Sequence, residues 1–371
     1  MASQMKYVRV GKSGLKVSRI ILGCMSFGDK NWQPWLLDKD EALPILKYAF
    51  DRGINTWDVA DTYSNGKSEE IVGAAIKEYN IPRSRLVVMS KCFQFVDEDK
   101  GPIDPATLTS NDGPRVNQVG LSRKHILDAV DRSVERLGTY IDVLQIHRMD
   151  RDVPPEEIMK ALHDVIESGK VRYIGASSMA AWEFQMLQNI AYCNATGVGL
   201  FPWSPLAAGV LTHPWTDRSD LREQKDPFLQ LLFRTSENGA DKAIVGHVQE
   251  LAGKKNVSMA QVAQAWLISK GCMPICGLET KKRIDQAVGA LEVKLSADEV
   301  ARTLRSHLRH AIALRIFNNE LSLAPVSKPH RILDIGTVTG IWTMEFADRN
   351  PESKVLCTDL SPILPGYVPA D

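Results

Sequence analysis

Short β-branched runs alternate with amphipathic helical stretches through most of the first 300 residues, and this alternation limits the possible folds more than any other feature. A strand–helix–strand repeat needs right-handed crossovers, which make the strands of one sheet parallel. The repeat predicts an α/β fold, and the number of units favours a (β/α) barrel over a Rossmann sheet. Strands are expected at 20–24, 54–59, 86–90, 141–146, 171–176, 198–203 and 273–276. Helices are expected at 40–50, 68–79, 122–137, 155–168, 180–190, 241–254, 258–270 and 281–290.

The expected strands number seven, whereas a closed (β/α)8 barrel has eight. Residues 177–197 hold one helix and no further strand. We therefore expect the strands at 171–176 and 198–203 to become neighbours or to leave a gap. Alternatively, the apolar run at 332–335, which lies far away in the chain, supplies the eighth strand. The alternation stops near residue 300, which predicts a barrel domain over 1–300 and a separate segment over 312–371.

Charge and composition exclude several classes of protein. The chain has 45 Lys and Arg against 45 Asp and Glu, and 44% of its residues are apolar. This balance indicates a globular protein and argues against a nucleic-acid partner, which a basic surface would attract. No apolar run is long enough to span a membrane, and the start lacks a signal core. The six scattered cysteines fit free thiols in a reducing cytoplasm, with no metal-ligand spacing.

Four ionisable residues lie at or just beyond the ends of three successive expected strands. Asp58 ends one strand and Tyr63 follows it on the loop, while Lys91 and His147 end the next two. In a (β/α) barrel these ends form the mouth of the active site. Each residue alone fits a solvated strand end, but together at matching ends they predict a catalytic cluster.

The four side chains form a chemically coherent set. A tyrosine with a pKa near 10 is a weak proton donor at neutral pH. A nearby lysine lowers that pKa, an aspartate holds the lysine, and a histidine orients the carbonyl oxygen. Such a set can donate a proton to a carbonyl oxygen, or remove one from an alcohol, while a hydride is transferred at the carbon.

Residues 5–300 resemble the aldo-keto reductase family, most closely its fungal branch of aryl-alcohol dehydrogenases and secondary-metabolite reductases. The resemblance is carried by Leu15–Ser18 with Leu22–Gly23, Trp57–Tyr63, Lys91, Leu144–His147, Gly169–Gly175 and Trp203–Leu206. It implies that Asp58, Tyr63, Lys91 and His147 are the catalytic tetrad. Tyr63 would then be the proton donor when the pro-R hydride of NADPH reduces an aldehyde or ketone.

The resemblance also implies where NADPH binds across the barrel rim. Ser177 and Ser178 match the position that hydrogen-bonds the nicotinamide carboxamide, and Trp203 matches the ring that stacks on the nicotinamide. The other implied cofactor residues are Asp58, Ser204, Leu206, Lys281, Arg283 and Gln286. Lys281 or Arg283 would contact the 2′-phosphate, although a solvated basic helix start remains the alternative.

The chain departs from the family pattern between Ala191 and Tyr192. The family has its sixth strand and much of the following helix there, including a glutamine that binds the carboxamide. Losing one barrel strand exposes two edges, and each unpaired buried backbone group costs about 1–3 kcal/mol. We therefore expect an interrupted barrel, or a skipped-exon or decayed product.

Residues 312–371 resemble the start of a fungal class I methyltransferase. The carrying motif is a strand entering a glycine turn at 332–342, followed by a strand that ends in Asp359. The resemblance implies a short Rossmann-like βαβ fragment, with Asp359 at the ribose of S-adenosylmethionine. Val338 replaces the usual glycine of the turn, and so few elements cannot support a site alone.

The sequence thus predicts an NADPH-dependent reductase of a small aldehyde or ketone in fungal secondary metabolism. The expected substrates are aromatic or polyketide-type carbonyls, with a 2-keto acid as a further option. Two other hypotheses stay open: an inactive relative with at most cofactor binding, and a methyltransferase fragment. The sequence does not specify the oligomeric state.

Overall fold

A computed structural model describes residues 4–97, 109–179, 183–184, 187, 201–217, 219, 224–226, 239–304, 331–335 and 354–358. The chain divides into two compact units. The first comprises Met1–Pro205 and Lys270–Glu292, and the second comprises Leu206–Ser269 and Val293–Asp371. Among the described helices, none is both long and apolar enough to cross a membrane.

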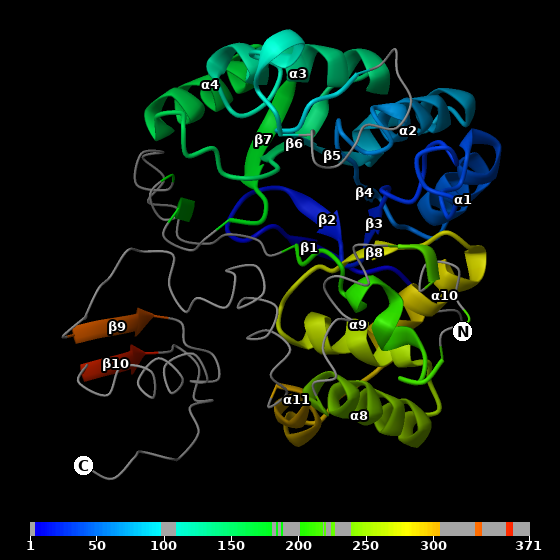
Figure 1. Ribbon diagram of the computed structural model, residues 1–371. Helices are drawn as coiled ribbons and strands as arrows, with labels where there is room; N and C mark the ends of the chain where they lie inside the picture. The colour runs from blue at the N-terminus through cyan, green and yellow to red at the C-terminus, as the bar shows by residue number, and fades with distance from the viewer. Residues whose placement is uncertain are drawn as a thin grey trace. The chain divides into compact units, whose positions relative to one another are not determined.

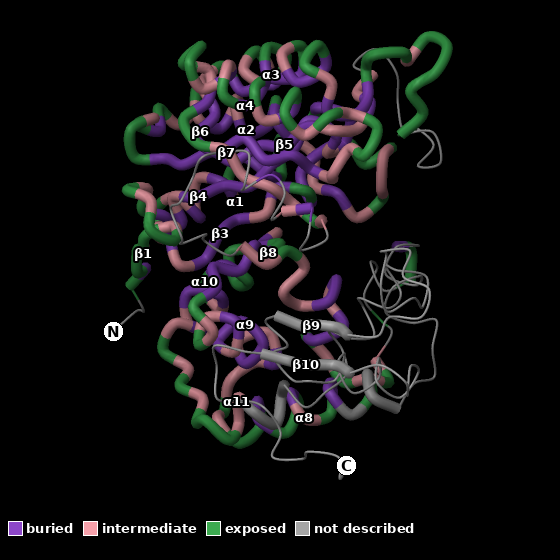
Figure 2. Tube along the Cα trace, turned by 90° about the vertical axis from the view of Figure 1, so that its left-hand side faces the viewer, coloured by how far each residue is buried: buried purple, intermediate pink, exposed green. Residues whose placement is uncertain are grey.

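The first unit is built on a parallel sheet of six strands in the order β7-β6-β5-β4-β3-β8. Their bounds are β3 Ile21–Gly23, β4 Thr56–Asp58, β5 Val87–Cys92, β6 Ile141–Ile146, β7 Val171–Ala176 and β8 Ile275–Gly277. Every residue of β5 and β6 is buried, and Figure 2 shows these strands in the interior of the unit. The predicted α/β class and parallel strand order are confirmed.

Helices cover the outer face of this sheet, and a described helix follows each strand except β7 (Figure 1). Neighbouring helices pack in the order α10, α1, α2, α3, α4, which follows the strand order. Their bounds are α1 Lys39–Asp51, α2 Lys67–Glu78, α3 Arg123–Leu137, α4 Pro155–Glu167 and α10 Lys281–Gly289, with short 3-10 turns η1 Arg83–Arg85, η3 Gly113–Arg115 and η6 Ala290–Glu292. The carboxyl ends of the strands consequently share one edge, where the predicted residues lie.

Local sequence signals account for several helix boundaries. The Ser122 side chain accepts a hydrogen bond from His125 N at 3.3 Å and starts α3 as predicted. Asp38 and Glu41 form a reciprocal capping box that starts α1. Gly53, at φ +86°, follows α1 in a conformation that favours glycine and confirms the predicted stop.

Two features of the first unit differ from the sequence expectation. Strands β1 Tyr7–Arg9 and β2 Lys16–Ser18 form an antiparallel hairpin that the strand–helix pattern did not predict. Residues 201–203 are not a strand, although 198–203 was expected to be one. Residues 198–200 lie outside the described residues, as does most of the helix expected at 180–190.

The two ends of the six-stranded sheet have different surroundings. At one end, Ile275 N donates to Pro202 O at 3.0 Å, so the segment before Trp203 runs beside β8. At the other end, β7 pairs with β6 alone among the described strands. Arg172 and Tyr173 of β7 are exposed, in contrast to the fully buried residues of β6.

The second unit contains helices α8 Gly239–Lys255, α9 Met259–Ser269 and α11 Ala297–Leu304, and the 3-10 turn η4 Ala207–Thr212. An apolar core joins η4, α8 and α9, with Val245, Val262 and Leu211 among its buried residues. Strands β9 Arg331–Ile335 and β10 Lys354–Thr358 pair in parallel as a two-stranded sheet. Val338 and Asp359 lie outside the described residues.

Candidate active site

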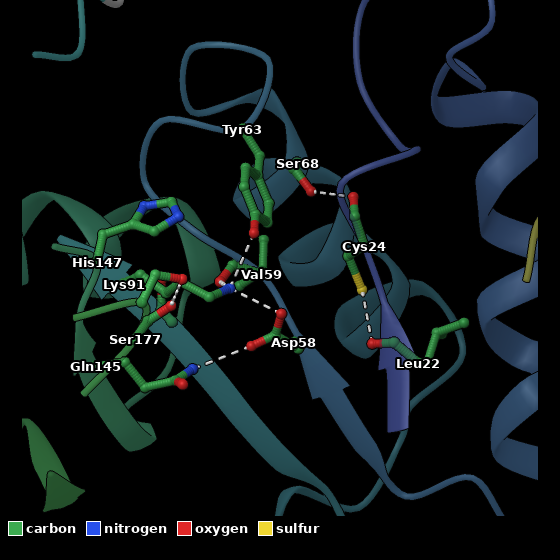
Figure 3. Close-up of polar contacts among 12 residues, drawn as sticks. Leu22, Cys24, Asp58, Val59, Tyr63, Ser68, Lys91, Gln145, His147 and Ser177 are labelled. Carbon is green, nitrogen blue, oxygen red and sulfur yellow. Dashed lines mark hydrogen bonds and ion pairs between the residues drawn. The ribbon is translucent and has the colours of Figure 1, made fainter. Parts of the chain in front are cut away.

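The loop that carries Tyr63 runs from the end of β4 to the start of α2 and is anchored on both sides. The Ser64 hydroxyl accepts from Asp29 N at 2.8 Å, and Asn65 Oδ1 accepts from Asp97 N at 2.8 Å. At the start of α2, the Ser68 hydroxyl donates to Cys24 O at 2.7 Å (Figure 3). These bonds hold the phenol of Tyr63 at the edge where the strands end.

Lys91, at the end of β5, joins three neighbouring groups (Figure 3). Its Nζ lies 2.7 Å from Asp58 Oδ2, 2.9 Å from Val59 O and 3.1 Å from the Tyr63 hydroxyl. A lysine ammonium has three donors, so these bonds use all of them. The Tyr63 oxygen accepts from Lys91 and keeps its own O–H free to donate to another group.

Burial and charge set the protonation states of the pair. Burial lowers the pKa of Lys91, but the charge of Asp58 and the hydrogen bonds outweigh it, so this pKa lies above its usual 10.5. Burial raises the pKa of Tyr63 above 10.0, although Lys91 acts against that rise. The expected lowering by Lys91 is thus present but smaller than the effect of burial. At neutral pH Tyr63 is a protonated donor beside a charged lysine.

His147 follows β6 and meets Tyr63 edge to face, with ring centroids 5.8 Å apart. Burial, then the charges of Lys91 and Arg148, lower the pKa of His147 well below 6.5, so its ring is neutral at pH 7. Its Nδ1 is buried and has no hydrogen-bond partner among the described residues. Because Nδ1 is enclosed by the protein, a ligand oxygen could reach this neutral ring only through its other nitrogen, Nε2.

Gln145 is a site residue that the sequence reasoning did not identify. Its Nε2 donates to Asp58 Oδ1 at 3.0 Å, while Lys91 occupies Oδ2 (Figure 3). Lys91 and Gln145 are register partners on β5 and β6, so both reach the same carboxylate. On the other side, a Cβ at Gly175 would lie 3.1 Å from Gln145 Cγ, so this glycine leaves room for the amide.

Gln145→Leu is expected to lower the free energy of unfolding by about 1–3 kcal/mol, because Asp58 Oδ1 loses its buried donor. Urea unfolding of the wild type and the variant measures this difference. Gln118→Leu is the matched control, because it removes an amide that donates to Pro114 O from an exposed position. Equal losses in the two variants would contradict a specific role for the Asp58 contact.

The residues predicted to bind the nicotinamide are Ser177 and Ser178, near His147, and Trp203. Ser177 N donates to Ile146 O at 2.9 Å, and Ile146 directly precedes His147 in the chain. The Ser177 hydroxyl lies 3.3 Å from the Ser178 hydroxyl. Ser178 and Ser204 both have positive φ, at 50° and 48°. Such strained non-glycine residues often cluster at ligand sites. Trp203 is 46% exposed, which leaves ring surface available for stacking.

The predicted phosphate contacts lie in the first turn of α10. The side chain of Thr280 caps this helix by accepting from Arg283 N at 3.1 Å. Arg283 forms an ion pair with Glu279, whose other carboxylate oxygen accepts from the Ser26 hydroxyl. Lys281 is exposed, with Nζ 5.3 Å from the centroid of the Tyr48 ring. Gln286 lies further along α10, whereas Leu206 belongs to the second unit.

Comparison with known proteins agrees with this geometry. Residues 19–191 and 188–307 match the Aldo/keto reductase family. The chain belongs to the aldo/keto reductase family. This membership implies a TIM-type α/β barrel and a nicotinamide-dependent reductase that acts on small carbonyl compounds. Among the described residues, no cluster of His, Cys, Asp and Glu is suited to hold a metal ion.

Curated members of the aldo/keto reductase family from fungi are close relatives. The chain is 55% identical over 326 residues to a versiconal hemiacetal acetate reductase of Aspergillus parasiticus, covering 80% of this chain and 95% of the relative. It is 48% identical over 331 residues to a Schizosaccharomyces pombe protein that carries the name of an aryl-alcohol dehydrogenase, covering 79% and 93%. It is 42% identical over 345 residues to the aldo-keto reductase AMT2 of Alternaria alternata, covering 81% and 91%.

Proposed function

We propose that this chain uses NADPH to reduce an aldehyde or ketone to the alcohol, with Asp58, Tyr63, Lys91 and His147 as the catalytic residues. The observation that carries the proposal is the placement of Lys91 Nζ between Asp58 Oδ2 and the Tyr63 hydroxyl. NADPH oxidation by the purified full chain, followed at 340 nm with a panel of aromatic aldehydes, tests it.

In the proposed reaction, Tyr63 donates its proton to the substrate oxygen. NADPH, when bound, would supply the hydride that reduces the carbonyl carbon. The phenolate that forms lies 3.1 Å from the Lys91 ammonium, which stabilises the new negative charge. Asp58 Oδ2 accepts from that ammonium and holds it in position, while Gln145 holds the carboxylate by donating to Asp58 Oδ1. The neutral His147 ring holds the carbonyl oxygen beside the phenol.

The residues present fit a nicotinamide cofactor on several grounds. Ser177 and Ser178 offer hydroxyls next to His147, and the exposed ring of Trp203 offers a stacking face. We infer that the carboxamide binds at the two serines, with Ser204, Leu206 and Gln286 contacting other parts of the cofactor. The relatives' names, a hemiacetal acetate reductase and an aryl-alcohol dehydrogenase, make a hemiacetal or an aromatic carbonyl the favoured substrate class.

Replacing Lys281 and Arg283 together by Ala is expected to reduce the preference for NADPH over NADH by about 10- to 100-fold, because a charge-assisted bond to the 2′-phosphate is lost. Fluorescence titration with both cofactors measures this preference. Lys282→Ala, which removes an exposed cation from the same turn, is the control. If the double variant prefers NADPH as strongly as the wild type, the cations in the first turn of α10 are only solvated and do not contact the 2′-phosphate.

We propose further that the barrel is interrupted between β7 and the segment at 201–203. The two stretches that match the family meet at 188–191. The alignment with the Aspergillus relative runs over 326 positions but covers only 80% of 371 residues, so the relative has positions with no counterpart here. The exposed Arg172 and Tyr173 of β7 agree with a strand that lacks its outer neighbour.

Inserting the relative's unmatched segment between Ala191 and Tyr192 is expected to raise kcat/KM by up to about 10²-fold. The reason is that Ser177 and Trp203 flank the interruption, and a shift of about 1 Å in such groups can cost that factor. Steady-state kinetics of the chain with and without the insertion measure the gain. An insertion that folds and leaves kcat/KM unchanged would show that the interruption does not affect the site.

We propose that residues 1–300 form the reductase and that 312–371 form a methyltransferase-like fragment without activity. The parallel pairing of β9 with β10 supports a βαβ unit. Val338 places a side chain where a glycine would let the backbone approach S-adenosylmethionine. Photolabelling with radioactive S-adenosylmethionine is therefore expected to leave the chain unlabelled, and specific labelling would contradict this assignment.

A further inference from the structure

An open cavity of about 330 Å³ is lined by residues that follow the carboxyl ends of three strands. Phe93 follows β5, Arg148 and Met149 follow β6, and Ser178 follows β7. Its walls thus combine apolar surface with a cation and a hydroxyl. A cavity with this mixture is typical of a site for a small molecule.

None of the three acidic side chains that line this cavity forms an ion pair with Arg148. Asp150 accepts from Leu121 N at 2.7 Å and from Asp152 N at 3.0 Å. Glu183 is buried and lies 2.7 Å from Arg151 Nε. The side chain of Asp152 is exposed to solvent, which screens its charge.

Arg148 differs from these groups because its charge has no carboxylate partner in the described parts of the chain. One of its guanidinium nitrogens, Nη1, donates to His147 O at 2.7 Å. This contact uses one N–H of a terminal guanidinium nitrogen, and the remaining donors are not used by any described residue. Burial lowers the pKa of Arg148 and nearby Tyr63 raises it, so the charge is partly desolvated and close to the phenol.

We propose that Arg148 binds an anionic oxygen of the carbonyl substrate, a carboxylate or an ionised phenol, which the cavity holds while the substrate carbonyl faces Tyr63. This inference rests on the proposed reductase function and narrows its substrate class. A partly desolvated guanidinium forms short, charge-assisted and often bidentate bonds with such oxygens. An anion here would also pair with a cation that has no carboxylate partner among the described residues.

Calorimetric titration of the full chain with two matched pairs of aldehydes tests the proposal. One pair is 4-carboxybenzaldehyde and methyl 4-formylbenzoate, and the other is 4-hydroxy-3-nitrobenzaldehyde and its 4-methoxy analogue. The wild type is expected to bind the anionic member of at least one pair more tightly. The pair that shows the preference distinguishes a carboxylate from a phenolate. Titrations with and without NADP⁺ give affinities that do not depend on turnover.

Arg148→Met is expected to reduce the preference for the anionic member by about 10- to 100-fold, and Arg148→Lys to retain part of it. Asp152→Asn is the control, because it changes an exposed charge of the same cavity. Equal binding of both members by the wild type, or an undiminished preference in a folded Arg148→Met, overturns the proposal. Turnover of the neutral aldehydes with NADPH tests the reductase function separately, so either idea can fail alone.

Discussion

Tyr63→Phe is expected to lower the rate of carbonyl reduction by about 10²- to 10⁴-fold, the usual cost of removing a positioned general acid. The phenol is the group whose hydroxyl accepts from Lys91 and still has a proton to donate. Turnover with aromatic aldehydes measures the loss. Fluorescence titration with NADPH is expected to show nearly unchanged cofactor binding, because the ring itself is retained.

His147→Asn provides the comparison that separates two possible acids. The buried neutral ring of His147 orients the substrate in the proposed reaction, so this variant should lose less activity than Tyr63→Phe. Full turnover in Tyr63→Phe together with complete loss in His147→Asn would assign the proton to His147. That result would overturn the role proposed for Tyr63.

Lys91→Met is expected to reduce both activity and stability. The Lys91–Asp58 pair is almost fully buried, with side chains 5% and 4% exposed. Removing one partner of a buried ion pair typically costs about 3–5 kcal/mol, because the other charge is left without compensation. The phenolate of Tyr63 also loses its stabilising cation, so turnover should fall by about 10²- to 10⁴-fold. Urea unfolding and steady-state kinetics measure the two effects.

The double variant Lys91→Met with Asp58→Asn distinguishes these two consequences. Neutralising Asp58 removes the unpaired charge, so most of the lost stability should return while turnover stays low. A double variant that recovers turnover would mean that Lys91 acts only through folding. A Lys91→Met variant as stable as the wild type would contradict the buried ion pair.

The order of strands and helices was predictable because its signals are local. The strands at 141–146 and 171–176 were predicted to the residue, and both are apolar runs that follow a glycine closing the preceding helix. The hairpin of β1 and β2 gave no such signal, because each strand is only three residues long and β1 is largely exposed. Residues 201–203 looked like a strand, but strand formation depends on partners, which local propensity does not reveal.

In the candidate site too, positions in the sequence predicted which residues come together, whereas packing in the fold sets their pKa values. That Asp58, Tyr63, Lys91 and His147 come together was predictable from their places at and just after strand ends. Gln145 was not predicted, although its position carries a signal. It lies two residues before His147, so strand alternation puts Gln145 and His147 on one face of the sheet. The net rise in the pKa of Tyr63 was not predictable, because burial opposes Lys91 and only the fold sets their balance.

Deuterium transfer from NADPH labelled at the pro-R position of C4 tests the proposed carbonyl reduction itself. We expect the full chain to place deuterium on the carbinol carbon of the alcohol formed from an aromatic aldehyde. We expect no transfer from cofactor labelled at the pro-S position, and a rate of transfer reduced about 10²-fold or more in Tyr63→Phe. Transfer from the pro-S position, or equal rates in the wild type and Tyr63→Phe, would contradict the proposed role of Tyr63 and of the pro-R hydride.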